Sequence, residues 1–125
     1  MNRDMFLGNR PKLKSELVAV PEYGPEATIM VEELTALQKG IIQSKSLTWK
    51  DGETSLNLDA MAESDIALVI ASARCEPGVP MFEETDKGVL AGFGGELIGR
   101  IAEAARRVSG MDKTNKQAKE EAKGN

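Results

Sequence analysis

The sequence predicts a single compact domain that is mainly α, with about four to five helices and a small β-hairpin near its N-terminus. The chain has 125 residues, a length that suits one domain. Aromatic residues make up only 4% of it, so the core must consist mostly of aliphatic and alanine side chains, which suit close helix packing. Apolar residues recur at helical spacing from residue 34 onward, whereas the clearest β-favouring runs fall within residues 16–32.

Residues 1–14 are expected to form an N-terminal arm. They are mostly polar and are punctuated by Gly8 and Pro11. The exception is the apolar sequence Met5-Phe6-Leu7, which we expect to form one helical turn that docks on the body of the protein.

Two short β-favouring runs, at residues 17–20 and 28–31, predict a hairpin over residues 16–32. The segment between them contains Pro21 and Gly24, which favour turns. Because proline cannot donate to a neighbouring strand, at least one of the two strands should lie at a sheet edge. An isolated hairpin is only marginally stable, so this one must pack on a helix, pair with more strand or contact a neighbouring subunit.

The first clear helix is expected from Thr35 to about Ser46. Thr35 and Gln38 fit a capping box, in which each side chain binds the backbone amide of the other residue. The predicted apolar face of this helix comprises Leu34, Leu37, Ile41 and Ile42.

Residues 47–58 are predicted to connect this helix to the next. The Lys-Asp-Gly sequence at residues 50–52 is a turn signal, which leaves a second short hairpin open as an alternative to a loop. Asn57 or Asp59 can cap the second helix, which should run to about Cys75 before a Glu-Pro-Gly sequence stops it.

A short helix should begin at Glu83 or Thr85 and end before residues 92–95, whose Gly-Phe-Gly-Gly sequence breaks it. The last helix is predicted over residues 96–109, with Gly110 as its C-terminal cap. Its apolar stripe comprises Leu97, Ile98, Ile101, Ala104, Ala105 and Val108.

The domain proper is therefore expected to span residues 15–110. Residues 111–125 are charged and have no large apolar side chain after Met111. Such a segment buries too little apolar surface to offset the entropy lost on ordering, which predicts a flexible charged tail.

Composition excludes several classes of function. The net charge of −4 disfavours broad nucleic-acid binding, and no apolar run approaches the roughly 20 residues that span a bilayer. The chain has no histidine and a single cysteine, Cys75, which we expect to be a buried or half-buried thiol. Since no segment is predicted to span a membrane, we expect a cytosolic protein. Lack of histidine removes the commonest general base and zinc ligand, so we also expect that the protein is not an enzyme and uses no cofactor or metal.

Three patterns suggest chemistry, and each has a simpler explanation. Residues 92–95 lack the further glycine or lysine of phosphate-binding loops. The oxygen-bearing side chains of residues 51–59 do not match the spacing of a calcium-binding EF-hand. The acidic cluster of Glu83, Glu84 and Asp86 is typical of a helix start, where carboxylates favour the helix dipole.

The remaining features favour a protein that binds other proteins. The chain combines a marginal hairpin, an interrupted helix and six methionines, a residue type common on adaptable binding surfaces. We expect contact with neighbouring copies or a client from apolar residues of the hairpin and of the segment before the last helix. These candidate contact residues are Val18, Val20, Tyr23, Ile29, Val31, Phe82 and Phe93.

Three segments resemble the tail assembly chaperones of long-tailed, siphovirus-type bacteriophages. They are residues 18–24 (Val-Ala-Val-Pro-Glu-Tyr-Gly), residues 29–35 (Ile-Met-Val-Glu-Glu-Leu-Thr) and residues 79–86 (Val-Pro-Met-Phe-Glu-Glu-Thr-Asp). In order and spacing they are similar to that family over about residues 17–110. Tyr23 stands where the family more often has tryptophan, and Glu32 where it commonly has arginine.

The resemblance implies a non-catalytic assembly factor in the host cytoplasm. Such a chaperone would bind the tape measure protein, help to recruit tail tube protein subunits, and self-associate into oligomers or spirals. Many members of the family are also made in a longer form by ribosomal frameshifting. The alternative left open by the residues alone is a small regulatory adaptor, similar to an anti-repressor or antitoxin, that binds one protein partner.

Overall fold

A computed structural model of the chain describes residues 1–45, 47–50, 53–56 and 58–111. Within these residues the chain forms five α-helices, two short 3-10 helices and six strands. Four strands make an antiparallel sheet in the order β1-β2-β5-β6, and the other two form a separate hairpin. The prediction of a mainly α domain with one small hairpin is therefore approximate, because the hairpin is part of a larger sheet.

The predicted N-terminal hairpin is confirmed as β1 (Ser15–Ala19) and β2 (Thr28–Glu32). Val18 is buried on β1 whereas its neighbour Leu17 is 64% exposed, as expected for a strand with one face toward a core. The connection contains the 3-10 helix η1 (Pro21–Tyr23). β1 lies at the edge of the sheet, whereas β2 pairs on both sides.

The second helix ends three residues earlier than predicted. α3 spans Leu58–Ser72, and β5 (Ala73–Glu76) follows it at once and pairs with β2. The helix ends early because of a tertiary contact. Residues 73–76 pair with the open side of β2, and this pairing overrides the helical pattern of the sequence. The prediction of a buried or half-buried Cys75 is also wrong, since this thiol lies exposed on β5.

A second tight hairpin completes the sheet. β6 (Val79–Pro80) pairs with β5 across the two-residue turn Pro77-Gly78. Gly78 has a φ of 80°, a conformation that suits glycine at the third position of a type II turn after proline. The Glu-Pro-Gly sequence therefore reverses a strand and does not end a helix.

α2 (Ala36–Lys45) begins with the predicted capping box. The amide of Gln38 donates to Thr35 Oγ1 at 3.2 Å, and the amide of Thr35 donates to Gln38 Oε1 at 3.0 Å. The predicted apolar face of α2 is only partly correct. Ile42 is buried, but Leu37 is 74% exposed and Ile41 is 46% exposed.

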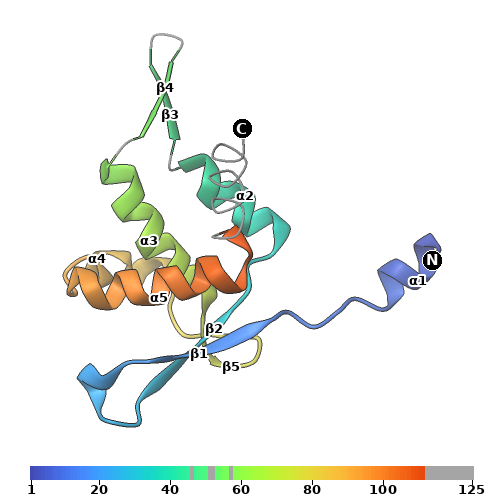
Figure 1. Cartoon of the computed structure of the whole chain (residues 1–125), viewed down its shortest axis with the longest axis horizontal. Helices are drawn as coiled ribbons and strands as arrows, with labels where there is room; N and C mark the ends of the chain where they lie inside the picture. Colours follow the sequence, from blue (N-terminus) through green and yellow to red (C-terminus); the bar gives the residue numbers. More distant parts are fainter. Residues whose placement is uncertain (46, 51–52, 57, 112–125) are drawn as a thin grey trace, which may run out of the picture.

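The connection between α2 and α3 contains the second hairpin that the sequence left open. β3 (Leu47–Lys50) pairs antiparallel with β4 (Glu53–Leu56). In Figure 1 this hairpin extends from the top of the two helices, away from the sheet. The expected turn at residues 51–52 and the candidate cap Asn57 lie outside the described residues.

The C-terminal part of the domain follows the prediction closely. η2 (Glu84–Asp86) and α4 (Lys87–Leu90) precede the glycine-rich corner, and α5 spans Gly95–Val108. Ile98, Ile101 and Ala105 of the predicted stripe are buried. Gly110 ends the helix with a φ of 76°, and residues 112–125, predicted to be a flexible tail, lie outside the described residues.

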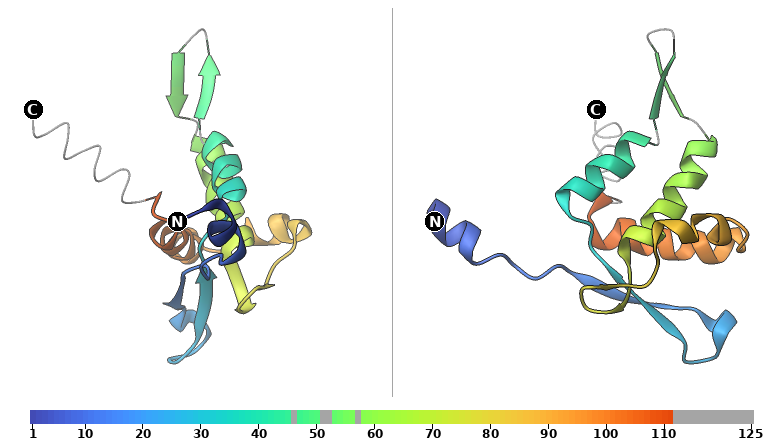
Figure 2. Two further views of the ribbon diagram at one scale, coloured as in Figure 1. Left: turned by 90° about the vertical axis from the view of Figure 1, so that its right-hand side faces the viewer. Right: turned by 180° about the vertical axis from the view of Figure 1, so that it is seen from behind.

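The core lies where α5 packs against both α3 and the β1–β2 hairpin, an arrangement visible in Figures 1 and 2. Leu68 and Val69 of α3 and Val31 of β2 have no exposed surface there. The amide of Leu34 donates to Ser109 Oγ at 3.0 Å, which joins the end of β2 to the end of α5. No helix in the described residues is long and apolar enough to cross a membrane.

The N-terminal arm does not dock on the body, contrary to the prediction. α1 (Arg3–Gly8) has no buried residue, and its first turn is capped by Asn2 Oδ1, which accepts from the amide of Met5 at 2.9 Å. Met5, Phe6 and Leu7 are 53%, 67% and 59% exposed. Figures 1 and 2 show α1 at the end of an extended segment that leads away from the sheet.

Candidate functional site: an apolar pocket beside the hairpin tip

A pocket of about 350 Å³ lies between the tip of the β1–β2 hairpin, the connection from β6 to η2, and the corner between α4 and α5. We refer to it as the apolar pocket. Its lining residues are Val20, Tyr23, Ala27, Thr28, Ile29, Val69, Met81, Phe82, Leu90, Phe93, Leu97, Ile98 and Ile101.

Aliphatic side chains form the floor of the apolar pocket. Val20 and Ile29 come from the hairpin, and Ile98 and Ile101 come from α5; all four are 5–7% exposed. The two sets meet because β1 and β2 turn one face toward the apolar stripe of α5. The floor is thus an accessible edge of the hydrophobic core.

Larger and more exposed side chains form the rim. Tyr23 is 66% exposed, Phe93 is 40% exposed and Met81 is 37% exposed, while Phe82 is half-buried. Local backbone structure holds two of them. Tyr23 ends η1, where its amide donates to Val20 O at 3.0 Å, and the amide of Phe93 donates to Leu90 O at 3.1 Å. Aromatic and methionine side chains of this kind are enriched at the centres of protein interfaces.

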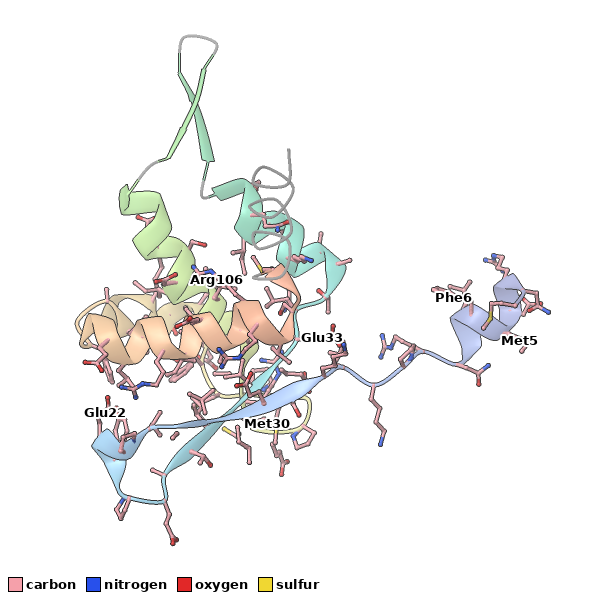
Figure 3. All side chains as sticks on the ribbon, viewed as in Figure 1. Met5, Phe6, Glu22, Met30, Glu33 and Arg106 are labelled. Carbon is pink, nitrogen blue, oxygen red and sulfur yellow. The ribbon has the colours of Figure 1, made fainter. Side chains whose placement is uncertain are left out.

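An ion pair fixes the hairpin tip against α5. Arg100 Nη1 and Nη2 donate to the two Glu22 carboxylate oxygens at 2.9 and 3.0 Å. This hydrogen bonding lowers the pKa of Glu22 below its ordinary value. The bidentate geometry restrains η1, and with it the adjacent Tyr23 at the pocket rim. Figure 3 labels Glu22 at this tip, below the helix that carries Arg100.

The lining suits apolar ligands and offers little for acid–base chemistry. Among the lining residues, only Thr28 and Tyr23 carry polar side-chain groups. A pocket of this size and composition can take two or three apolar side chains of another polypeptide. No group of three or more His, Cys, Asp or Glu side chains that could hold a metal ion occurs in the part of the chain that the structure describes.

The structure brings five of the seven candidate contact residues together in this pocket: Val20, Tyr23, Ile29, Phe82 and Phe93. The other two, Val18 and Val31, do not line it and are buried, at 6% and 0% exposed. A contact role for these two side chains stays a prediction, because neither lines the pocket. They belong to the core that supports the hairpin.

A second cavity, also of about 350 Å³, lies between α2, α3 and β6. We refer to it as the α2 cavity. It is less apolar, because Gln38, Arg74 and Glu84 contribute to its lining. Phe82 lines both cavities. Sequence reasoning missed the α2 cavity because it assigned Ile41, which lines it, to the buried face of its helix.

Two of the three other sequence patterns that suggested chemistry have structural roles. Glu83 and Asp86 form a reciprocal capping box at η2, in which the amide of Glu83 donates to Asp86 Oδ2 at 2.8 Å. The glycine-rich residues 92–95 make the corner between α4 and α5, with Gly94 as the N-cap of α5. Asp51 and Asn57 of the rejected calcium loop lie outside the described residues.

Comparison with solved structures shows a likeness that covers most of this chain. No protein-family model matches the sequence, and no curated protein matches it. The structure of the bacteriophage HK97 tail assembly chaperone is similar, with a TM-score of 0.59 and 16% sequence identity over 77% of this chain and 85% of that chain. This chain therefore has the fold of a tail assembly chaperone, as the sequence resemblance predicted.

Proposed function

We propose that this chain is a non-catalytic chaperone of phage tail assembly that binds the tape measure protein in the host cytoplasm. The observation that carries the proposal is the shared fold, which extends over most of both chains. The sequence resemblance supports it independently, because the segments that carry that resemblance also supply Tyr23 and Phe82 of the pocket rim.

The apolar pocket is the surface that we assign to the client. A tape measure protein is long and helical, and its apolar side chains must be shielded until the tail tube assembles around it. A pocket that accepts a few apolar side chains can bind many similar segments along such a client. Many weak contacts of this kind combine into strong overall binding without one deep site.

Recruitment of tail tube protein is a further part of the proposal. A chaperone that coats the tape measure protein presents its outer surface to arriving subunits. The α2 cavity, which shares Phe82 with the apolar pocket, is available for such a second contact.

Co-expression with the tape measure protein of the same phage tests the client assignment. The full chain should keep the client soluble and should elute together with it. Phe93→Asp places a charge at the pocket rim and should weaken client binding at least tenfold, the size expected for a central interface residue. Leu37→Asp is the matched control, because Leu37 is 74% exposed and lies outside both cavities.

Three outcomes decide the proposal. Loss of binding in Phe93→Asp with binding retained in Leu37→Asp supports the pocket as the client site. Equal binding by both variants refutes that assignment. The third outcome is that the chain binds neither the tape measure protein nor the tail tube protein but forms a fixed one-to-one complex with another phage or host protein. That result refutes the chaperone function and favours the small regulatory adaptor.

A further inference from the structure

The N-terminal arm presents an apolar surface that the rest of the chain leaves uncovered. Met5, Phe6 and Leu7 are consecutive, and each is more than half exposed. Figure 3 shows Met5 and Phe6 on a helix that stands away from the body. Exposed apolar side chains gathered on one short segment are typical of a contact that forms with another molecule.

The arm and the rest of the chain have opposite charges. Residues 1–14 contain four basic side chains and one acidic one, a net charge of +3. Because the whole chain has a net charge of −4, the remainder carries −7. The arm is therefore a basic segment with an apolar centre, attached to an acidic domain.

Four acidic residues are sequence neighbours of residues that line the apolar pocket, and two of them, Glu22 and Glu96, pair with Arg100. Glu22, Glu26, Glu83 and Glu96 are each the immediate sequence neighbour of a residue that lines it. Glu26 and Glu83 are exposed and form no ion pair with any residue that the structure describes. An apolar pocket with an acidic rim is complementary to an apolar helix with basic neighbours.

The arm and the pocket lie at opposite ends of β1. The arm enters β1 at Ser15, whereas the pocket begins beyond Ala19, a distance of about 17 Å for a five-residue strand. Residues 9–14 connect α1 to β1 and span at most about 20 Å when fully extended. To reach its own pocket, the arm would have to fold back on itself with this connection almost completely stretched. The arm of another molecule has no such restriction.

We propose that the apolar pocket of one copy of this chain binds Met5, Phe6 and Leu7 of a second copy, while its acidic rim contacts the basic side chains of that arm. The contact is head-to-tail, so each copy offers one arm and one pocket. Contacts of this type build rings or open helical assemblies when each copy binds the arm of a different neighbour, and a closed dimer when two copies exchange arms. Because the pocket is also the surface assigned to the client, a client segment and a neighbouring arm compete for it; the arm contact itself requires no client.

Cysteine cross-linking of the full-length protein tests the contact directly and without any client. Both partners carry Cys75→Ser, which removes the exposed native thiol. One partner then carries Gly8→Cys at the end of α1, and the other carries Ala91→Cys, an exposed position between the pocket residues Leu90 and Phe93. Neither substitution removes an apolar side chain that the contact uses.

Mixing the two single-cysteine proteins under mild oxidation should give a cross-linked heterodimer. A control mixture pairs Gly8→Cys with Leu37→Cys on α2, and its yield of cross-linked heterodimer should be at least tenfold lower. Equal cross-linking in the two mixtures overturns the proposal. A chain with both Gly8→Cys and Ala91→Cys that forms only a link within itself, at every concentration, also overturns it, because the arm then occupies its own pocket.

Light scattering coupled to size-exclusion chromatography provides an independent measurement on unlabelled protein. Assembly of the unmodified chain should grow with protein concentration and weaken as NaCl rises, because added salt screens the contact between the arm and the rim. Phe6→Asp should raise the concentration needed for assembly at least tenfold, whereas Leu37→Asp should not change it. Unchanged assembly in Phe6→Asp, or a monomer at all concentrations of the unmodified chain, refutes the arm contact whatever the outcome of the client experiment.

Discussion

Glu32 and Arg74 form a buried ion pair between β2 and β5, and its removal measures how strongly the sheet depends on it. Arg74 Nε lies 3.1 Å from Glu32 Oε1, and the two side chains are only 10% and 11% exposed. Arg74 Nη1 also donates to Ala73 O at 3.0 Å. The pair anchors the strand that leads to β6 and then to Phe82 at the pocket.

Single and double substitutions should give very different results. Glu32→Leu leaves the buried guanidinium without its anion, and removal of one partner of a buried pair costs about 3–5 kcal/mol. Arg74→Met leaves the buried Glu32 carboxylate without its cation and should cost a similar amount. The double variant buries no uncompensated charge, so we expect its free energy of unfolding to fall by about 1 kcal/mol or less. The coupling between the two sites, which is the sum of the single losses minus the double loss, should therefore be about 5 kcal/mol or more.

Urea denaturation followed by circular dichroism measures the free energy of unfolding of all four proteins. For a domain of this size a loss of about 3 kcal/mol also lowers the melting temperature by roughly 12 °C or more. Single variants that each lose less than about 1 kcal/mol would refute the reasoning, because the two charges would then be solvated and nearly independent.

Three further perturbations test local features of the fold. Thr35→Ala removes the hydroxyl that accepts from the amide of Gln38 and should lower the free energy of unfolding by about 1 kcal/mol in urea denaturation. Gly110→Ala should destabilise by about 1 kcal/mol because its φ is 76°, whereas Gly40→Ala inside α2, where an added Cβ meets nothing within 4 Å, should stabilise by a similar amount. The Arg100 guanidinium holds the pKa of Glu22 below its ordinary value of 4.5, so the stabilisation from this pair is present at neutral pH and is lost as the pH falls below that value. In an NMR titration the pKa of Glu22 should rise in Arg100→Gln; an unchanged pKa would show that the pair does not form in solution.

The elements with local signals were predictable from the sequence. The capping box of Thr35 and Gln38 located the start of α2, and the apolar stripe with a terminal Gly110 located α5. These signals act within one or two helical turns, so the sequence of the segment alone contains them. The first hairpin was predictable for the same reason, because its two strands flank a turn of a few residues.

The elements that depend on distant partners were not predictable in this way. Residues 73–76 continue a helical pattern, and only the open side of β2 makes them a strand. Leu37 and Ile41 lie at helical spacing with buried residues but are exposed, Leu37 outside both cavities and Ile41 at the α2 cavity, because no element in the described residues covers them completely. The pocket is an intermediate case. Its rim residues were identified as contact candidates, but Val18 and Val31 share the same strand pattern and are buried beneath the sheet face.

Phe82 forms a wall of both cavities, so it couples them mechanically. Its ring cannot move toward the α2 cavity without narrowing that cavity, and the same movement enlarges the apolar pocket by the volume that the ring leaves. Both cavities are open at about 350 Å³ in this structure, so the position of this one ring sets how the space is divided between them.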